Sequence, residues 1–385
     1  MDRFLSTLET ELRRPPCTRV ERLAMHQRLT DGFAEFGRTA LNLDERHLQM
    51  LFAGGFSNIG TAMAREARRF DSDVTIADIF QASRNAWTAC GLQVLFGGAM
   101  SLSPSIFAYS MLYPYTDNYL DDPATPARTK HGFNRRFSLR LLGQDVAPEG
   151  RHEVLIWRLV ELIESQYPRG EFPGIYDSLL QIQAAQEKSL ALLRNAAAEE
   201  SVDVLALSFE KGGASVLADG YLAAGSLSAD RAAFVYNWGI FLQLADDLQD
   251  VQEDRRDGVR TIFSQAAGRE PLDGLTNRLM QFGGRVMMQM HDLPDVNCLP
   301  LRQLITRSCL SFLVRSAGES GAFFTPEYVA QIETLSPFRF GFLSDRRRKF
   351  ERHSGLMGKL FEAFLAGDPD EPAFPLLPSS LMPRF

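Results

Sequence analysis

Apolar residues recur every three or four positions along almost the whole chain, and alternating stretches rich in β-branched residues are nearly absent. This spacing places apolar side chains on one face of an α-helix, whereas a half-buried strand requires alternation at every second residue. The sequence therefore predicts an all-α fold. With 385 residues, 45% of them apolar, the chain can bury one large helical core, and no repeat of fixed period indicates a solenoid.

Proline, glycine, asparagine and aspartate residues mark the ends of the predicted helices. We expect helices over residues 19-39, 43-54, 57-69, 74-97, 104-122, 131-142, 150-168, 174-195, 201-225, 229-254, 258-268, 273-292, 298-318, 325-336 and 341-366. No linker-like segment separates them, so we expect one all-α domain over residues 1-366. Residues 367-385 are expected to form a proline-rich C-terminal tail.

Charge and motif content exclude several functional classes. The 41 basic and 48 acidic residues give a net charge of −7, which does not favour nucleic acid as a partner. No zinc-ligand spacing, G-x-S-x-G turn or glycine-rich phosphate loop is present, so hydrolase, kinase and zinc chemistry have no support. The four cysteines are widely separated, and no apolar run of about 20 residues occurs. We therefore expect a cytoplasmic protein without a transmembrane segment.

The stretch QLADDLQDVQED, residues 243-254, concentrates acidic side chains on one predicted helix. On a helix that begins near Ser228, its five acids fall within a stripe about 120° wide. The opposite side is an apolar seam of Phe234, Phe241, Ala245 and Leu248. Carboxylates four residues apart repel one another, but each can give an oxygen ligand to Mg²⁺. The stretch thus predicts a metal site, with a solvated acidic face as the alternative.

A second acidic cluster, YTDNYLDDP, ends a strongly apolar predicted helix. Asp117 and Asp121 are four residues apart on one face, Asp122 follows them, and Pro123 ends the helix. Acidic groups near a helix C-terminus oppose the helix dipole, so a charged helix end is the less favoured alternative to a metal site. Two clusters that each terminate an apolar helix suggest two metal-binding walls that face each other across a pocket.

Other polar residues share faces with these clusters or stand on a neighbouring predicted helix. Ser110 and Tyr113 precede Asp117 on its face. An otherwise apolar helix carries one polar stripe, made of Ser208, Lys211, Ser215 and Asp219. Gly239 lies on the same face as the later acids, where it either leaves room for a substrate or permits close helix packing.

The two acidic clusters resemble motifs of the class I isoprenoid synthases. DNYLDD is similar to the first aspartate-rich motif of that superfamily, in the DxxxDD form of squalene and phytoene synthase relatives. FLQLADDLQDVQEDRRDGVRT, with Gly258 and Thr261, resembles the second motif of trans-prenyl diphosphate synthases. In FEKGGASVLADGYLAAGSL, Lys211 stands where those synthases have a diphosphate-binding lysine. The resemblance covers residues 80-265 and implies an all-α bundle around a central cavity.

The resemblance also implies the site, which would hold Mg²⁺, more than one ion, and a prenyl diphosphate substrate. The implied metal ligands are Asp117, Asp121, Asp122, Asp246, Asp247, Asp250 and Asp254. The expected catalytic residues are Asp117, Asp121, Asp246 and Lys211. The expected substrate-binding residues are Lys211, Arg128, Lys130, Arg135, Arg136, Arg260, Tyr113, Tyr236 and Gln243, and for each basic group an ordinary exposed charge is the alternative. Relatives of this class are often homodimers.

Departures from the family pattern bear on the reaction. The early Gly-Lys-Arg motif of chain-elongating synthases is missing from LFAGGFSNIGTAMAREARRF, and the N-D-x-x-S-x-x-x-E triad of microbial cyclases is missing too. We therefore expect a terpene synthase that ionises an allylic prenyl diphosphate, releases pyrophosphate, and cyclises, rearranges or couples the carbocation. The alternatives are a chain-elongating trans-prenyl diphosphate synthase and, from another class, a non-catalytic helical scaffold or regulatory subunit.

Overall fold

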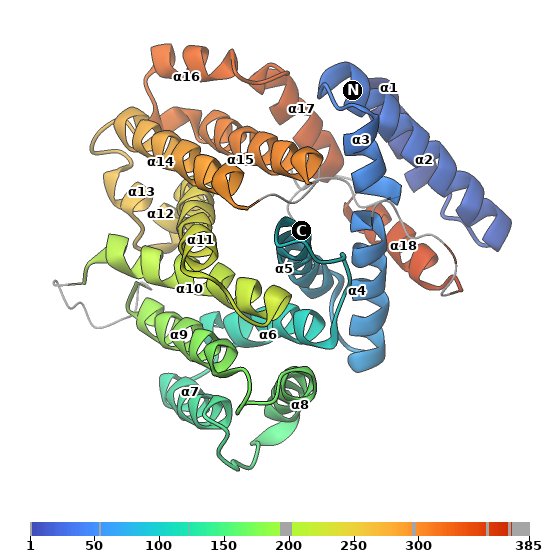
Figure 1. Ribbon diagram of the computed structural model, residues 1–385. Helices are drawn as coiled ribbons and strands as arrows, with labels where there is room; N and C mark the ends of the chain where they lie inside the picture. The colour runs from blue at the N-terminus through green and yellow to red at the C-terminus, as the bar shows by residue number, and fades with distance from the viewer. Residues whose placement is uncertain are drawn as a thin grey trace.

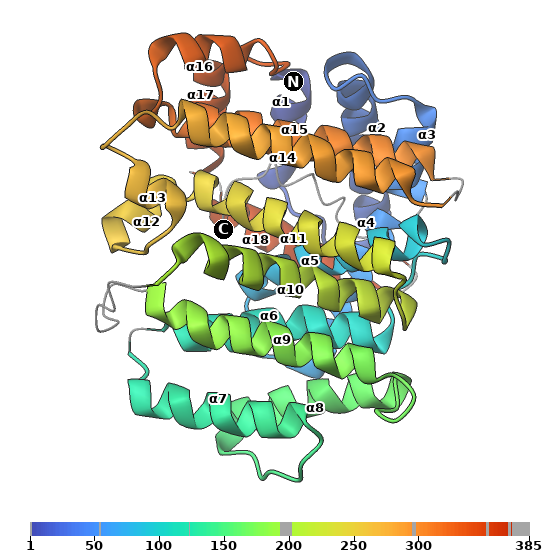
Figure 2. The same ribbon diagram turned by 60° about the vertical axis from the view of Figure 1, so that its left-hand side comes forward.

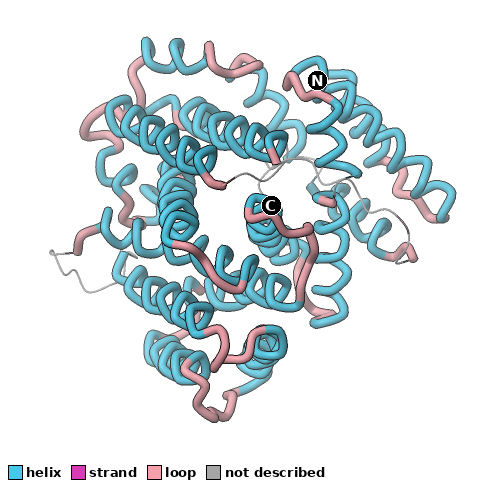
Figure 3. The backbone as a smooth tube through the Cα atoms, in the orientation of Figure 1, coloured by secondary structure: helices cyan, strands magenta, loops and turns pink. Residues whose placement is uncertain are grey.

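The computed structural model describes residues 2-53, 55-122, 124-192, 202-294, 298-351, 354-368 and 371. Within these ranges the regular structure is helical, as Figure 3 shows, apart from an isolated bridge between Ala267 and Glu270. The predicted all-α class is therefore confirmed. None of the described helices combines the length and the apolar composition that crossing a bilayer requires.

The helices follow one another along the chain without a long gap between them. The first are α1 (Asp2–Leu12), α2 (Arg19–Ala40), α3 (Glu45–Leu48), the π-helical η1 (Gln49–Ala53), α4 (Phe56–Phe70) and α5 (Ile76–Leu95). The next are α6 (Pro104–Asp121), α7 (Ala127–Leu141), α8 (Gly150–Gln166), α9 (Pro173–Ser189), the 3-10 helix η2 (Leu190–Leu192), α10 (Val204–Ala224) and α11 (Ala229–Gln249). The last are α12 (Val251–Asp257), α13 (Ile262–Ala266), α14 (Asp273–Asp292), α15 (Leu299–Glu319), η3 (Gly321–Phe323), α16 (Pro326–Glu333), α17 (Phe340–Glu351) and α18 (Ser354–Leu365).

Side-chain caps fix where the helices of the candidate site begin. The Ser103 hydroxyl accepts a hydrogen bond from the backbone N–H of Ile106 at the start of α6. The Asp203 carboxylate accepts a hydrogen bond from a backbone N–H in the first turn of α10. The Ser228 hydroxyl accepts one in the first turn of α11, where the sequence predicts a cap. Such caps satisfy backbone donors that have no partner in the first turn, and each stabilises its helix by about 1 kcal/mol.

Several predicted helix bounds differ from the structure. Helix α1 was not predicted, because its pattern is short, yet Phe4, Leu8 and Leu12 are buried along one face of it. The range predicted as 43-54 divides into α3 and η1. The range predicted as 341-366 is described as α17 and α18, and residues 352 and 353 lie outside the described part of the structure. Of the predicted C-terminal tail, only residues 367, 368 and 371 are described.

The helix predicted over residues 229-254 is not continuous. Helix α11 ends at Gln249, and Asp250, with φ −93° and ψ 4°, lies between it and α12. The backbone hydrogen bonds nevertheless continue, from Asp250 N–H to the Asp246 carbonyl at 2.8 Å and from Asp254 N–H to the Asp250 carbonyl at 2.8 Å. The chain bends within the acidic stretch, so the straight stripe expected for all five acids holds only up to this point.

The helices form successive layers, which Figure 2 shows from α7 and α8 at the bottom, through α6 and α9, then α10 and α11, to α14 and α15, with α16 and α17 above them. Helix α5 lies in the middle of the molecule and contacts α4, α6, α10 and α15 (Figure 1). Helices α5 and α10 contribute to both apolar cores, one built on α6 and α8 and the other on α11, α14 and α15. The two acidic motifs therefore belong to helices on either side of α10.

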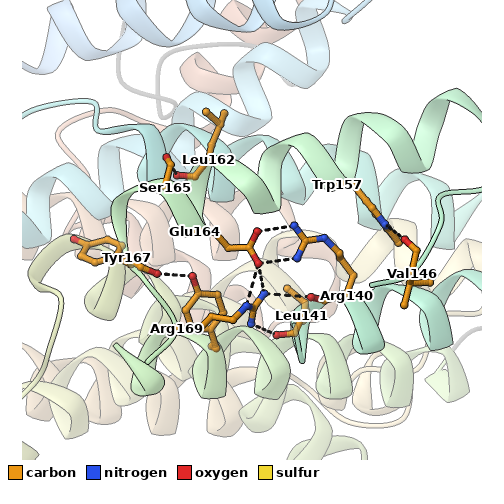
Figure 4. A network of polar contacts seen from close by, with 10 residues as sticks. Arg140, Leu141, Val146, Trp157, Leu162, Glu164, Ser165, Tyr167 and Arg169 are labelled. Carbon is orange, nitrogen blue, oxygen red and sulfur yellow. Dashed lines mark hydrogen bonds and ion pairs between the residues drawn. The ribbon is translucent and has the colours of Figure 1, made fainter. Parts of the chain in front are cut away.

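A polar network ties α7 to α8 and to the turn that follows α8 (Figure 4). The Glu164 carboxylate accepts two hydrogen bonds from Arg140, at 2.7 and 2.6 Å, and two from Arg169, at 3.0 and 2.7 Å. Arg169 also donates to the carbonyl oxygens of Arg140 and Leu141 and lies over the ring of Tyr176 at 3.9 Å. This network fixes the end of α7 against the end of α8.

Candidate active site

Helices α10 and α11 touch through glycine. A Cβ atom placed on Gly239 would lie 2.1 Å from the carbonyl oxygen of Gly212, and one placed on Gly212 would lie 2.6 Å from the carbonyl oxygen of Gly239. A Cβ on Gly213 would lie 2.5 Å from the ring of Tyr236. Of the two explanations for Gly239, close helix packing is therefore the right one, because the space beside it is filled by the backbone of α10.

This close crossing places the polar stripe of α10 against the acids of α11. The Ser208 hydroxyl donates to Asp247 Oδ2 at 3.2 Å, and the Gln243 amide donates to Asp247 Oδ1 at 2.8 Å. Burial raises the pKa of Asp247 to about 7, although both hydrogen bonds and the positive charge of Lys211 act in the opposite direction. Lys211 is thus close enough to Asp247 for its charge to be felt by the carboxylate.

The acids on both sides of the bend remain close to one another. Burial, together with the negative charges of Asp247, Asp250 and Asp246, raises the pKa of Asp254 to about 8. The Thr261 hydroxyl lies 3.5 Å from Asp254 Oδ2. A cation placed among these carboxylates would relieve their mutual repulsion, so the donor set fits a hard divalent ion.

The first motif lies at the C-terminal end of α6. The Asp117 side chain is 9% exposed, and the Thr116 hydroxyl lies 3.4 Å from its Oδ1. Asp122 accepts hydrogen bonds from the Ala124 N–H at 2.9 Å and from the Thr125 hydroxyl at 2.8 Å, which lower its pKa. Asp122 therefore stabilises the turn after α6. The side chain of Asp121 lies outside the described part of the structure.

Three contacts show that α6 and α10 run in opposite directions. Near the start of α6, the Ser105 N–H donates to Gln166, whose neighbour Tyr167 donates to the carbonyl oxygen of Leu222 near the end of α10. Further along, the Tyr109 hydroxyl donates to the Ser215 carbonyl oxygen at 3.0 Å. Eight residues beyond Tyr109 comes Asp117, and seven residues before Ser215 comes Ser208, so the two lie at the same end of the helix pair.

The basic residues that the sequence suggests have different surroundings in the structure. Lys130 attracts Asp122, which places it beside the first motif. Arg136 forms ion pairs with Glu153 at 2.5 Å and Glu149 at 3.0 Å, so we do not assign it to the site. The side chains of Arg128 and Arg135 are exposed on α7.

A pocket of about 360 Å³ adjoins Asp254 on the outer side of the second motif. It is lined by Asp254, Arg255, Gly258, Val259, Arg260, Ser264, Gln265, Ala267 and Arg269. Arg260 is thus placed next to the acids, as the sequence suggested. Arg255 and Arg269 also line this pocket, and no sequence motif points to Arg269, because it lies beyond the short helix α13.

The remaining predicted residues lie on the expected helices. Tyr113 follows Tyr109 by one turn on α6 and contributes to the raised pKa of Tyr109, and Gln243 donates a hydrogen bond to Asp247 on α11. Tyr236 packs its ring against Gly213 of α10, so it covers the helix crossing. The apolar seam of α11 is confirmed, because Phe234, Phe241, Ala245 and Leu248 are all fully buried.

Among the described residues, no three histidine, cysteine or acidic side chains form a ready-made metal cluster. Mg²⁺ keeps several of its waters and bridges to substrate phosphates, so it does not require an all-protein cage. Carboxylates from two walls, each giving one or two oxygens, are consistent with that manner of binding.

Comparison with known proteins adds nothing to this geometry: no family model, no curated protein and no solved structure matches the chain.

Proposed function

We propose that this protein is a Mg²⁺-dependent class I terpene synthase, which ionises an allylic prenyl diphosphate with release of pyrophosphate. The proposal rests on one observation above all. The crossing of α10 and α11 brings Lys211 within electrostatic reach of the buried carboxylate of Asp247, while the antiparallel packing of α6 brings Asp117 to the same end. A cation and two sets of carboxylates at one end of an apolar helix bundle suit a diphosphate that binds together with metal ions.

Each residue of this set has a separate role in the proposal. Asp117 on one wall, and Asp246, Asp247, Asp250 and Asp254 on the other, would hold the metal ions. Bound Mg²⁺ would neutralise the charge that accumulates on the departing diphosphate. Lys211 binds a diphosphate oxygen directly, as a compact point charge. Ser208 and Gln243 orient Asp247, because each donates one hydrogen bond to a different oxygen of its carboxylate.

The apolar walls between α5, α6, α10 and α11 would enclose the hydrocarbon chain. They would keep water away from the carbocation, which then cyclises, rearranges or couples with a second chain. Tyr113, on the same face of α6 as Asp117, offers an aromatic face toward the reacting carbons, and such a face stabilises a passing cation.

The proposal is tested by turnover with defined substrates. Purified protein is incubated with geranyl, farnesyl and geranylgeranyl diphosphates, with and without isopentenyl diphosphate, in Mg²⁺ or in a chelator. Released pyrophosphate is measured and the products are analysed by mass. We expect Mg²⁺-dependent pyrophosphate release without isopentenyl diphosphate, and about 100-fold or greater loss of rate in Asp117→Ala and in Asp246→Ala.

A matched control comes from the same acidic stretch. Glu253 is exposed and lies 3.3 Å from Arg256, so Glu253→Gln removes a charge of α12 outside the proposed ligand set. We expect this variant to keep its rate. Turnover that is unaffected by both aspartate variants would contradict the two-wall site.

The same assay separates the alternatives. Consumption of isopentenyl diphosphate with a longer diphosphate product would identify a chain-elongating synthase. A helical scaffold or regulatory subunit would release no pyrophosphate from any of these substrates in the presence of Mg²⁺.

A further inference from the structure

Asp219 is a buried acid that the proposed ionisation step does not use. Its side chain is 1% exposed and lies on α10, where α5 and α6 pack against it. The Asn85 amide donates to Asp219 Oδ1 at 3.0 Å and also to the Ser110 hydroxyl at 3.2 Å. The other oxygen, Oδ2, has no hydrogen-bond partner among the described residues. Buried polar atoms rarely lack a partner, so this atom calls for an explanation.

The surroundings of Asp219 hold it in the neutral form. Burial raises the pKa of its carboxyl well above the ordinary value, and only the Asn85 hydrogen bond acts against this. The ionisable groups that sense its charge are Cys90 from α5 and Tyr109 from α6, which are neutral at pH 7, and burial raises the pKa values of both still further. An unpaired buried carboxylate is costly, so the group keeps its proton. Because Oδ1 accepts from Asn85, the proton is on Oδ2.

Asp219 also lies at a definite distance, measured along the helices, from the end of the site that would bind the diphosphate. On α10 it lies eight residues from Lys211, which corresponds to about 12 Å along a helix. On α6, its neighbour Ser110 lies seven residues from Asp117, which corresponds to roughly 10 Å. The two walls thus give nearly the same depth. A prenyl diphosphate whose head group lies between Lys211 and Asp117 would extend its hydrocarbon chain toward Asp219.

We propose that Asp219 is an acid and base catalyst that acts on the hydrocarbon part of the substrate, and this inference rests on the proposed function. After ionisation, the released pyrophosphate removes a first proton from the carbocation to leave a neutral olefin, and Oδ2 then gives its proton to one alkene carbon. The O–H bond breaks, the π electrons form the new C–H bond, and the other alkene carbon becomes a cation beside the new carboxylate. The carboxylate then removes a proton from a carbon next to the cation, the C–H electrons form a double bond, and Asp219 is regenerated.

Asn85 is a positioning residue in this scheme. Its amide occupies Oδ1 and so leaves the reactive oxygen, Oδ2, on the side where the described residues offer no hydrogen-bond partner. The ion pair of carboxylate and carbocation would be short-lived, because the low-dielectric surroundings favour return of the proton. The alternative is a polar core residue whose Oδ2 meets only a buried water.

The experiment uses the full chain in D₂O with the prenyl diphosphate that it turns over best. We expect the wild-type product to carry solvent deuterium on carbon. In Asp219→Asn we expect a deuterated fraction about 100-fold lower, as for loss of a general acid, with the neutral olefin as the new product. Asn85→Ala should lower the deuterated fraction less than Asp219→Asn does.

The matched control is Ser215→Ala, which alters the same stripe of α10 without touching a carboxyl group, and its product should keep the deuterium. Retained deuterium in Asp219→Asn, or a wild-type product without deuterium, would overturn the inference while pyrophosphate release still supports the proposed function. Absence of pyrophosphate release from the wild type would overturn both. Far-ultraviolet circular dichroism and the melting temperature establish that each variant is folded.

Discussion

The carbonyl oxygen of Gly212 on α10 lies 2.1 Å from the position that a Cβ atom on Gly239 of α11 would occupy. The two helix backbones are therefore in direct contact, and neither position accepts a side chain without a shift of the backbone. This contact fixes the position of α10 relative to α11. It is the reason that Ser208 meets Asp247 across the crossing, at 3.2 Å.

Gly239→Ala should destabilise the protein and disturb the site together. The added methyl group has no space, and overpacking of this kind costs about 1–3 kcal/mol of unfolding free energy. Gly284→Ala on α14 is the control, because nothing lies within 4 Å of its Cβ position and alanine favours a helix by up to ~1 kcal/mol. Urea unfolding of both variants measures the difference. Equal stability of the two would show that the backbones are not in contact.

Lys211→Met should weaken the binding of inorganic pyrophosphate in the presence of Mg²⁺. Loss of one charge-assisted contact is expected to cost about 1.5–3 kcal/mol, or roughly a 10- to 100-fold higher Kd in a calorimetric titration. Lys188→Met is a suitable control, since Lys188 on α9 pairs with Glu210 at 2.5 Å and is exposed. An unchanged Kd for Lys211→Met would remove this lysine from the diphosphate site.

Asp246→Asn should leave the metal-free protein as stable as the wild type or more stable, because it removes one of several repelling charges. Its melting temperature should then rise less on addition of Mg²⁺, since an ion that binds only the folded state stabilises it in proportion to its affinity. A thermal-shift titration with Mg²⁺ measures both effects. The same Mg²⁺ response in Asp246→Asn and in the wild type would contradict a metal site at this residue.

Asp219 predicts a dependence of stability on pH. Because burial raises its pKa in the folded state, the folded protein binds one proton more than the unfolded chain at pH values above 3.8, the ordinary pKa of this carboxyl. Stability must then fall as pH rises through this window, by up to about 1.4 kcal/mol per pH unit from this residue. Asp219→Asn lacks that contribution. Urea unfolding at pH 5, 6, 7 and 8 should therefore show the wild type losing stability relative to the variant, and a constant difference would mean that Asp219 is ionised in the fold.

Glu164→Gln should lower the free energy of unfolding without affecting Mg²⁺ binding. Its carboxylate accepts four hydrogen bonds from Arg140 and Arg169, and replacement leaves both guanidinium groups with weaker acceptors (Figure 4). A loss of roughly 1–3 kcal/mol is expected. Glu171→Gln, an exposed glutamate in the turn that follows α8, is the control and should change stability little. Equal effects of the two changes would show that the network contributes nothing.

Local periodicity was enough to predict the helices that surround the site. The apolar seam of α11 was assigned from its spacing alone, and Phe234 and Phe241 are buried as expected. The Ser228 cap follows equally from local chemistry, since its hydroxyl satisfies a donor three residues away. The helical spacing of the polar residues of α10 also predicts that Asp219 lies on the same face as Lys211.

Other features depend on contacts between distant parts of the chain. Whether there is free space beside Gly239 depends on Gly212, which belongs to a different helix. The sequence suggests Arg136 as a diphosphate ligand, whereas in the structure it forms an ion pair with Glu153 of α8. The bend at Asp250 interrupts a stretch whose local pattern is helical throughout.

The sequence by itself determined the all-α class and most helix ranges, because helical periodicity is a local property, and its side-chain chemistry supplied the candidates for metal and diphosphate binding that remain to be tested. Only the tertiary structure decided which of those residues meet. It brought Lys211 within electrostatic reach of Asp247, paired Arg136 with Glu153, and left one oxygen of Asp219 without a hydrogen-bond partner among the described residues. Burial and pairing arise from the packing of helices that are far apart along the chain, so no local pattern specifies them.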